Sequence, residues 1–488
     1  MNVKRFKKLH RVLWVLICTC LLVVIPACQN SSGTSSAHQI SAIPASDGTN
    51  STSFRLASQN KTTPAAAPVR GTNNTGSPPV LSGSGNIPAA FPHYFSFGVM
   101  SAPGTASLLD AMRSQNGTAF AFRYQYLSGG VNTNQGWETW NSPAGQFATY
   151  YMQESAQHGY TPAFAYYEIC QSNGPNPGSN CYGHDMQQDT ANLATPATMQ
   201  VYYGNWVLLM QKIKAYGKPV LVIVEPDLWG FLQMAANGSD NAANVPASVS
   251  SSGFADAAGF PNTAQGFAWA LLHMRDKYAP NATLALHASD WATSTDIGSD
   301  TRSSLDIAGL AHREAKFLKS AGLYGNPTGV SSWNLLSNDV ADHDAGQPGG
   351  IWWDRYNHTF PNFARYLKFI GLLSQDVHRR VVVWQVPIGN QYFDTMNNSS
   401  GHYQDNRAEY MLGNVAKFAA AGIIAVLFGP GNGGTMNIDK MNDGITNPAP
   451  ISTYECNLCN NHTSMYSDDD GGYLRIFVGL YMKHPLTI

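Results

Sequence analysis

The fold of this chain is predicted first from the segment Pro219-Val220-Leu221-Val222-Ile223-Val224-Glu225-Pro226-Asp227-Leu228-Trp229. Its apolar run, 220–224, has no polar break, which is typical of a parallel strand covered on both faces. The run ends abruptly at Glu225 and Asp227, on the side where parallel α/β folds place their chemistry. The alternative interpretation is a capped strand end, with Glu225 in a salt bridge and Asp227 capping the next helix.

Further apolar runs predict strands on both sides of this one, with amphipathic stretches between them. The other strands are expected at 94–99, 119–127, 162–169, 283–287, 329–336, 381–386 and 423–428, and helices at 198–216, 262–278, 304–321, 360–376 and 406–421. Strands that alternate with helices at this spacing predict an α/β fold, a TIM-like (β/α)8 barrel, rather than an antiparallel sandwich. An open doubly wound sheet is the alternative that the pattern leaves open.

The N-terminal part of the chain has the pattern of an export signal followed by a linker. Residues 1–27 contain a basic start and an apolar run that is shorter than a transmembrane helix usually needs. The run ends at Ile25-Pro26-Ala27-Cys28, which resembles a bacterial lipobox and predicts a lipid anchor on Cys28. Ordinary secretion with cleavage nearby is the alternative. Residues 28–88, rich in Ser, Thr, Asn, Gly and Pro, predict a disordered linker, and 89–488 form the predicted barrel domain.

The composition of the chain indicates which kinds of ligand the protein is expected to bind. Charged residues make up 12% of the chain and the net charge is −2, whereas soluble domains typically have about 25% charged residues. No basic excess argues for nucleic acid. We expect a monomeric protein at the cell surface of a bacterium that meets a neutral polysaccharide, with membrane contact only through its lipid anchor and without a cofactor.

The cysteines outside the signal also fit export. The simplest scheme pairs Cys170 with Cys181 and Cys456 with Cys459 as two local disulfides. A four-cysteine zinc site is the alternative, but the spacing of the first pair is poor for it.

Polar and aromatic side chains recur where the predicted strands end. Carboxylates, amides and tryptophans on one rim are the composition of a carbohydrate cleft, and we expect substrate contacts there. The residues assigned to this rim are Tyr167, Glu168, Trp229, His287, Asp290, Trp291, Asn338, Trp352, Gln385, Asn390 and Asn432. Trp384, inside an apolar run, is expected to point into the packing.

The Val224-Glu225-Pro226-Asp227 segment is similar to the motif of family 6 glycoside hydrolases, and that resemblance assigns the general acid to Asp227. The segments 284–291, 337–340 and 429–434 resemble later features of the same family. The resemblance implies a distorted barrel with seven strands. The chain departs from the family at His287, where the family has an aspartate, and in its late glycine loop, which has no acid. Glu168 and Cys170 also replace an aspartate-rich segment.

A second comparison is with retaining glycosidases that carry their acid at strand four and their nucleophile at strand seven. Glu225 fits the acid position. The seventh predicted strand ends Val383-Trp384-Gln385-Val386-Pro387, without a carboxylate, so this resemblance lacks a nucleophile.

These residues lead us to expect a glycoside hydrolase that acts on a β-glucan-like polysaccharide by inversion. Asp227 or Glu225 is the predicted acid, and Asp339, Asp342 or Asp344 is the predicted base. A hydrogen-bonded loop or a metal site with His343 is the alternative for the last two aspartates. The alternative function is a surface lipoprotein that binds carbohydrate without hydrolysing it.

Overall fold

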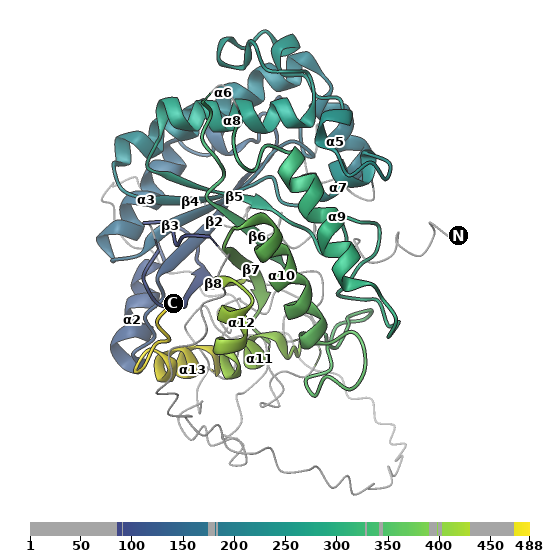
Figure 1. Cartoon of the computed structure of the whole chain (residues 1–488). Helices are drawn as coiled ribbons and strands as arrows, with labels where there is room; N and C mark the ends of the chain where they lie inside the picture. The colour runs from purple at the N-terminus through teal and green to yellow at the C-terminus, as the bar shows by residue number, and fades with distance from the viewer. Residues whose placement is uncertain are drawn as a thin grey trace, which may run out of the picture.

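The computed structural model is a closed barrel of parallel strands surrounded by helices (Figure 1). It describes residues 85–89, 91–173, 181, 184–326, 329–340, 345–389, 398, 403–429 and 473–488. The strands are β1 Ser96–Met100, β2 Phe122–Ser128, β3 Thr161–Tyr167, β4 Val220–Val224, β5 Ala282–His287, β6 Leu335–Asp339, β7 Val381–Pro387 and β8 Ile423–Gly429. Each strand pairs in parallel with its sequence neighbours, and β1 pairs with β8. The predicted (β/α)8 barrel is therefore confirmed, whereas the open sheet and the seven-stranded barrel are wrong.

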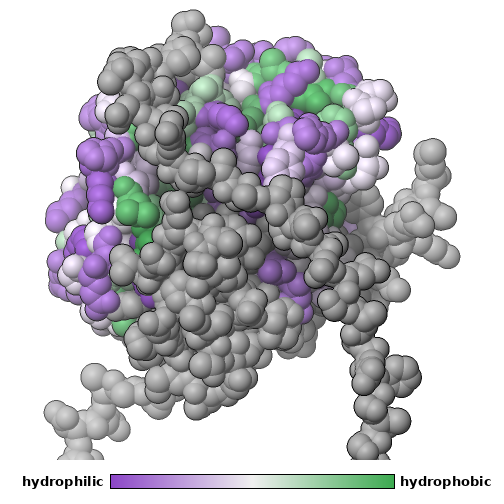
Figure 2. All heavy atoms as spheres, turned by 90° about the horizontal axis from the view of Figure 1, so that it is seen from below, coloured by the Kyte–Doolittle hydropathy of each residue, from purple (hydrophilic) through white to green (hydrophobic). Residues whose placement is uncertain are grey.

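The helices return the chain from one strand to the next on the outside of the barrel. They are α2 Ala106–Asn116, α3 Gln146–Gln157, α5 Asp185–Leu193, α6 Pro196–Tyr216, α7 Leu228–Ala235, α8 Ala264–Tyr278, α9 Ile307–Ser320, α10 Phe363–Val377, α11 Arg407–Gly413, α12 Val415–Ala420 and α13 Tyr473–Tyr481. None of the helices in the described part of the chain is long and apolar enough to span a bilayer. In the described part of the face seen from below, hydrophilic and hydrophobic residues are intermixed (Figure 2).

Alternation along β4 explains its unbroken apolar sequence. Leu221 and Ile223 belong to the cluster that fills the barrel, while Val220, Val222 and Val224 pack outward against the helices. Both faces of the strand are thus buried, as the sequence predicts. Inside the barrel, small residues such as Ala163 and Ala285 leave room for large ones such as Trp384.

The sixth strand differs from its predicted position. It was expected at 329–336, but β6 begins only at Leu335, which pairs with Ala285 of β5. Gly329 has a left-handed backbone, with φ +103°, and Trp333 donates its backbone N–H to Leu323 rather than to β5. Residues 330–334 therefore form the connection from α9. As a result, Asn338 and Asp339 end the strand instead of following it.

The predicted helix at 406–421 is also wrong in part, because it is divided into α11 and α12 at Asn414. This residue has φ −134° and its side-chain amide donates to the carbonyl of Tyr410. An asparagine that hydrogen-bonds a nearby carbonyl competes with the helical backbone pattern.

Gly98 supplies a test of how tightly the barrel is packed. A Cβ on this β1 residue would lie 2.5 Å from Leu427 and 2.7 Å from the Phe122 Cβ, whereas a Cβ on Gly204 of α6 would meet nothing within 4 Å. We expect Gly98→Ala to lower the free energy of unfolding by about 1–3 kcal/mol through overpacking. Gly204→Ala, the matched control, should raise it by up to about 1 kcal/mol through helix propensity. Urea unfolding of both variants measures this, and equal effects would contradict the packing.

Candidate active site

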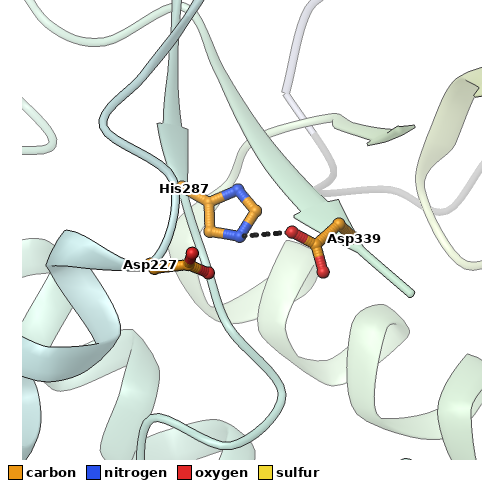
Figure 3. Close-up of side chains that lie close together, drawn as sticks. All are labelled: Asp227, His287 and Asp339. Carbon is orange, nitrogen blue, oxygen red and sulfur yellow. Dashed lines mark ion pairs between the residues drawn. The ribbon is translucent and has the colours of Figure 1, made fainter. Parts of the chain in front are cut away.

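Three consecutive strands bring Asp227, His287 and Asp339 together at the mouth of the barrel (Figure 3). Asp227 follows β4, His287 is the last residue of β5, and Asp339 is the last residue of β6. One oxygen of each carboxylate and one ring nitrogen of the imidazole all lie within 4.8 Å of one another. We call these three residues the mouth triad.

His287 is the buried centre of the mouth triad. Its Nδ1 lies 3.1 Å from the hydroxyl of Ser337, and its Nε2 lies 3.6 Å from Oδ2 of Asp339. Burial lowers the pKa of His287 to about 3, so the ring is neutral at neutral pH. The contact with Asp339 therefore joins a neutral imidazole to a carboxylate and is not a charged pair.

The turn after β4 aims Asp227 at this group. Glu225 and Asp227 both have left-handed backbones, with φ +45° and +67°. Asp227 occupies the N-cap position of α7, but its side chain makes no capping hydrogen bond. The alternative interpretation of Asp227 as a helix cap is therefore wrong. Non-glycine residues in this conformation cost about 1–3 kcal/mol each and cluster at functional sites.

Glu225 lies on the other side of the same turn, fully buried. Its carboxyl oxygens accept hydrogen bonds from the backbone N–H of Glu168 at 3.1 Å and of Ile169 at 3.3 Å. Burial raises the pKa of Glu225 to about 8, although the Tyr202 hydroxyl and these two amides oppose the shift. The carboxyl group binds backbone amides instead of forming the salt bridge of the alternative interpretation. Its place is behind the turn, where it fixes the chain after β3, rather than in the mouth triad.

Aromatic and amide side chains from β2 and β7 lie beside the mouth triad. The Trp384 ring is perpendicular to that of His287, with centroids 6.2 Å apart, and the Tyr126 ring lies 5.7 Å from Trp384. The Tyr126 hydroxyl donates to Oε1 of Gln385, whose backbone is also left-handed at φ +52°. Trp384 packs inside the barrel, as the sequence predicts. The predicted Gln385 thus contacts Tyr126, which lies beside Trp384 and so next to the mouth triad.

Sequence reasoning missed Tyr126 and Ser337, and also Tyr124, whose buried ring lies 5.9 Å from that of Trp384. The inward alternation of Tyr124-Gln125-Tyr126 in β2 is the signal that would have found the two tyrosines, because residues two apart face the same side of a strand. Ser337 is two residues before Asp339 and shares its face of β6, but only after the strand is placed correctly at 335–339.

Burial contradicts three of the predicted substrate contacts. Trp229 packs against Phe267 with ring centroids 5.6 Å apart, and its Nε1 donates to the Val224 carbonyl at 2.9 Å. Asn338 uses its amide on Ala288 and Tyr366, outside the barrel. Glu168 is fully buried, and that burial raises its pKa well above the usual range. These side chains support the frame of the mouth instead of offering a surface to a ligand.

Four other predicted contacts lie at the end of a strand or in the connection that follows one. Trp291 is half-buried, with its ring 4.6 Å from that of Phe231, and Asp290 precedes it. Trp352, in the connection after β6, is 39% exposed. Tyr167 packs beside Cys170 and Cys181, which form the predicted disulfide. That pairing is confirmed.

The remaining predicted residues lie outside the described part of the chain. They are Asp342, Asp344, Asn390 and Asn432 for the site, Cys28 for lipidation, and Cys456 and Cys459 for the second disulfide.

No family model matches the sequence, and no curated protein is detectably similar to it. Among solved structures, xylanase B from Clostridium stercorarium F9 is similar over 70% of this chain and 87% of its own, at 11% identity and a TM-score of 0.36. A Bacteroidetes-affiliated GH5 cellulase is similar over 80% and 92%, at 8% identity and a TM-score of 0.42. A family 1 β-glucosidase from Thermotoga maritima is similar over 69% and 88%, at 8% identity and a TM-score of 0.36. Similarity this low transfers neither residues nor substrates.

Replacing Glu225 tests whether it holds the mouth in place. Glu225→Ala removes the acceptor from two buried N–H groups, so we expect a loss of about 2–4 kcal/mol in the free energy of unfolding. Glu225→Gln keeps an acceptor and the shape, and should lose at most about 1.5 kcal/mol. Urea unfolding followed by tryptophan fluorescence measures both. An alanine variant as stable as the parent would show that the turn does not depend on this carboxyl group.

Proposed function

We propose that this protein hydrolyses glycosidic bonds in a polysaccharide, with Asp227 as general acid and Asp339 as the second carboxylate. The observation that carries the proposal is the approach of these two carboxylates, within 4.8 Å, at the mouth of a barrel. Glycoside hydrolysis needs a pair of carboxyl groups across the scissile bond, one that donates a proton and one that is ionised.

We propose a retaining mechanism in place of the inversion expected from the sequence. Inverting enzymes hold their carboxyl groups about 6.5–9.5 Å apart to admit a water molecule, and retaining enzymes about 5–5.5 Å. One oxygen of Asp227 and one oxygen of Asp339 lie within 4.8 Å of each other, which is compatible with the closer spacing. Asp342 and Asp344, the other predicted bases, lie outside the described residues.

The proposed reaction has two steps. Asp227 gives its proton to the glycosidic oxygen as the bond to the anomeric carbon breaks, and an oxygen of Asp339 bonds to that carbon. Asp227, now ionised, then takes a proton from a water molecule whose oxygen displaces Asp339. Glycan chemistry of this kind uses the same side chain first as acid and then as base.

The surroundings of the mouth triad support a sugar as ligand. Tyr126, which is partly buried, gives an aromatic surface next to Trp384, and its hydroxyl donates to Oε1 of Gln385. Pockets that bind neutral ligands combine such surfaces with a few placed polar groups. Charged residues make up only 12% of the chain, and this low fraction favours a neutral polysaccharide, such as a β-glucan, over an acidic one.

Substituting Asp227 tests the proposed acid. We expect the full chain, purified in detergent, to release reducing ends from a glucan, xylan or mannan, and Asp227→Asn to lower kcat/KM by about 10²–10⁴, the usual contribution of a general acid. Asp376→Asn, on the far end of α10, is the matched control and should behave as the parent. Sugar binding without release by all three proteins would favour the alternative function, a carbohydrate-binding surface lipoprotein.

We also infer export to the cell surface and lipid anchoring through Cys28. The basic start, the apolar run and the Ile25–Cys28 segment support this placement, and the Cys170–Cys181 disulfide is compatible with an oxidising compartment.

Cys28→Ala is expected to abolish anchoring, because only a cysteine at this position carries the lipid. In a bacterial host, the parent should partition into the detergent phase of a Triton X-114 extract and incorporate labelled palmitate. The alanine variant should do neither. Cys20→Ala, upstream in the apolar run, is the control that should leave both properties intact. Equal palmitate labelling of the Cys28 variant would contradict the assignment.

A further inference from the structure

We propose that the mouth triad also binds one divalent transition-metal ion, for which Zn²⁺ is the probe, and that the bound ion blocks hydrolysis. The binding rests on the geometry of Asp227, His287 and Asp339 alone. The inhibition rests in addition on the function proposed above.

The distances in the mouth triad are close to those of a metal site. Zinc lies about 2.0–2.2 Å from nitrogen and oxygen ligands, so two ligands in a tetrahedral site are about 3.4 Å apart. Nε2 of His287 and Oδ2 of Asp339 are already 3.6 Å apart, and no pair in the triad exceeds 4.8 Å. Small side-chain rotations would therefore complete the three contacts.

The environment of His287 supports ligation by its Nε2. The tautomer that donates Nδ1–H to the Ser337 hydroxyl, 3.1 Å away, leaves a lone pair on Nε2, on the side of Asp339. Metal-binding histidines are usually held in this way, by a hydrogen bond from the other ring nitrogen. Ser337 and His287 lie on paired strands, at the register pair of β5 and β6, so the ring is fixed by the barrel itself.

The set of donor atoms favours a transition metal. Imidazole suits zinc and its neighbours in the first row, whereas calcium takes six to eight oxygen ligands. The mouth triad offers one nitrogen and two carboxylates from the described residues. Water or a sugar hydroxyl would complete the coordination on the open side of the mouth.

A metal ion and the proposed reaction exclude each other. Carboxylates must be deprotonated to bind a metal, and binding releases their protons. An ion held by Asp227 and Asp339 would therefore remove the proton that Asp227 donates and occupy the oxygen of Asp339 that bonds to the anomeric carbon. The expected effect is inhibition that a chelator reverses.

The test titrates zinc chloride into the full chain in detergent, after EDTA treatment and dialysis, by isothermal calorimetry without substrate. We expect His287→Gln to remove one equivalent of zinc bound by the parent, while His312→Gln, an exposed residue of α9, leaves it intact. Ser337→Ala should weaken zinc binding about 10–100-fold, as the loss of an orienting hydrogen bond does. This second variant, with folding checked by circular dichroism, protects the test against misfolding of the histidine variant.

Zinc titration of reducing-end release completes the experiment. As zinc is added, the rate of hydrolysis should fall with the same midpoint as the binding of the zinc equivalent that His287→Gln removes. Addition of EDTA should restore the rate. Equal zinc binding by the parent and His287→Gln would overturn the site, and faster hydrolysis with zinc would overturn the inhibition. Zinc binding by a protein that hydrolyses no glycan would confirm the site while the proposed function fails, so the two failures are distinguishable.

Discussion

The turn from β4 into α7 is the constraint on which the mouth of this barrel depends. Glu225 and Asp227 both adopt left-handed backbones, an arrangement that costs about 1–3 kcal/mol at each residue and persists only where the surroundings impose it. Glu225 supplies part of that constraint, because its buried carboxyl group accepts N–H bonds from Glu168 and Ile169 of the neighbouring strand connection. With a relaxed backbone, Asp227 would be an ordinary helix cap. In the observed turn, its carboxylate reaches His287 instead.

Parallel pairing explains why three residues far apart in sequence meet at one point. Neighbouring strands in a sheet lie about 4.8 Å apart, and their carboxyl ends share one edge. His287 pairs with Ser337, and Asp339 follows two residues later, so the register alone brings imidazole and carboxylate together. The mouth triad thus rests on strand ends and one short turn.

The sequence predicted the barrel because strands such as β4 and β8 are apolar runs that can be recognised without tertiary information. The prediction failed where a local pattern competes with strand pairing. Residues 330–334 have the pattern of a strand but belong to the connection between α9 and β6. Asn414 divides a helix that otherwise has a continuous pattern. For the site, Asp227, His287 and Asp339, which the fold brings together, were named from the sequence because each lies at or just after a predicted strand. Side-chain direction was not visible, so the sequence could not separate Asp227, which lies in the mouth triad, from Glu225, which is buried behind the turn. Trp229 was misassigned for the related reason that an aromatic after a strand packs into a core as readily as it faces a ligand.

The closeness of Asp227 and Asp339 connects the two roles proposed for the mouth triad. Two ionised carboxylates within 4.8 Å repel each other, and the low dielectric around a buried ring makes that repulsion stronger than in water. A proton on one of them relieves it and provides an acid, whereas a divalent cation between them relieves it and removes the acid. His287 is suited to both states because, as a neutral ring, it does not itself compensate the charge. A positive residue at this position would have stabilised both carboxylates as anions and left no reason for either to hold a proton.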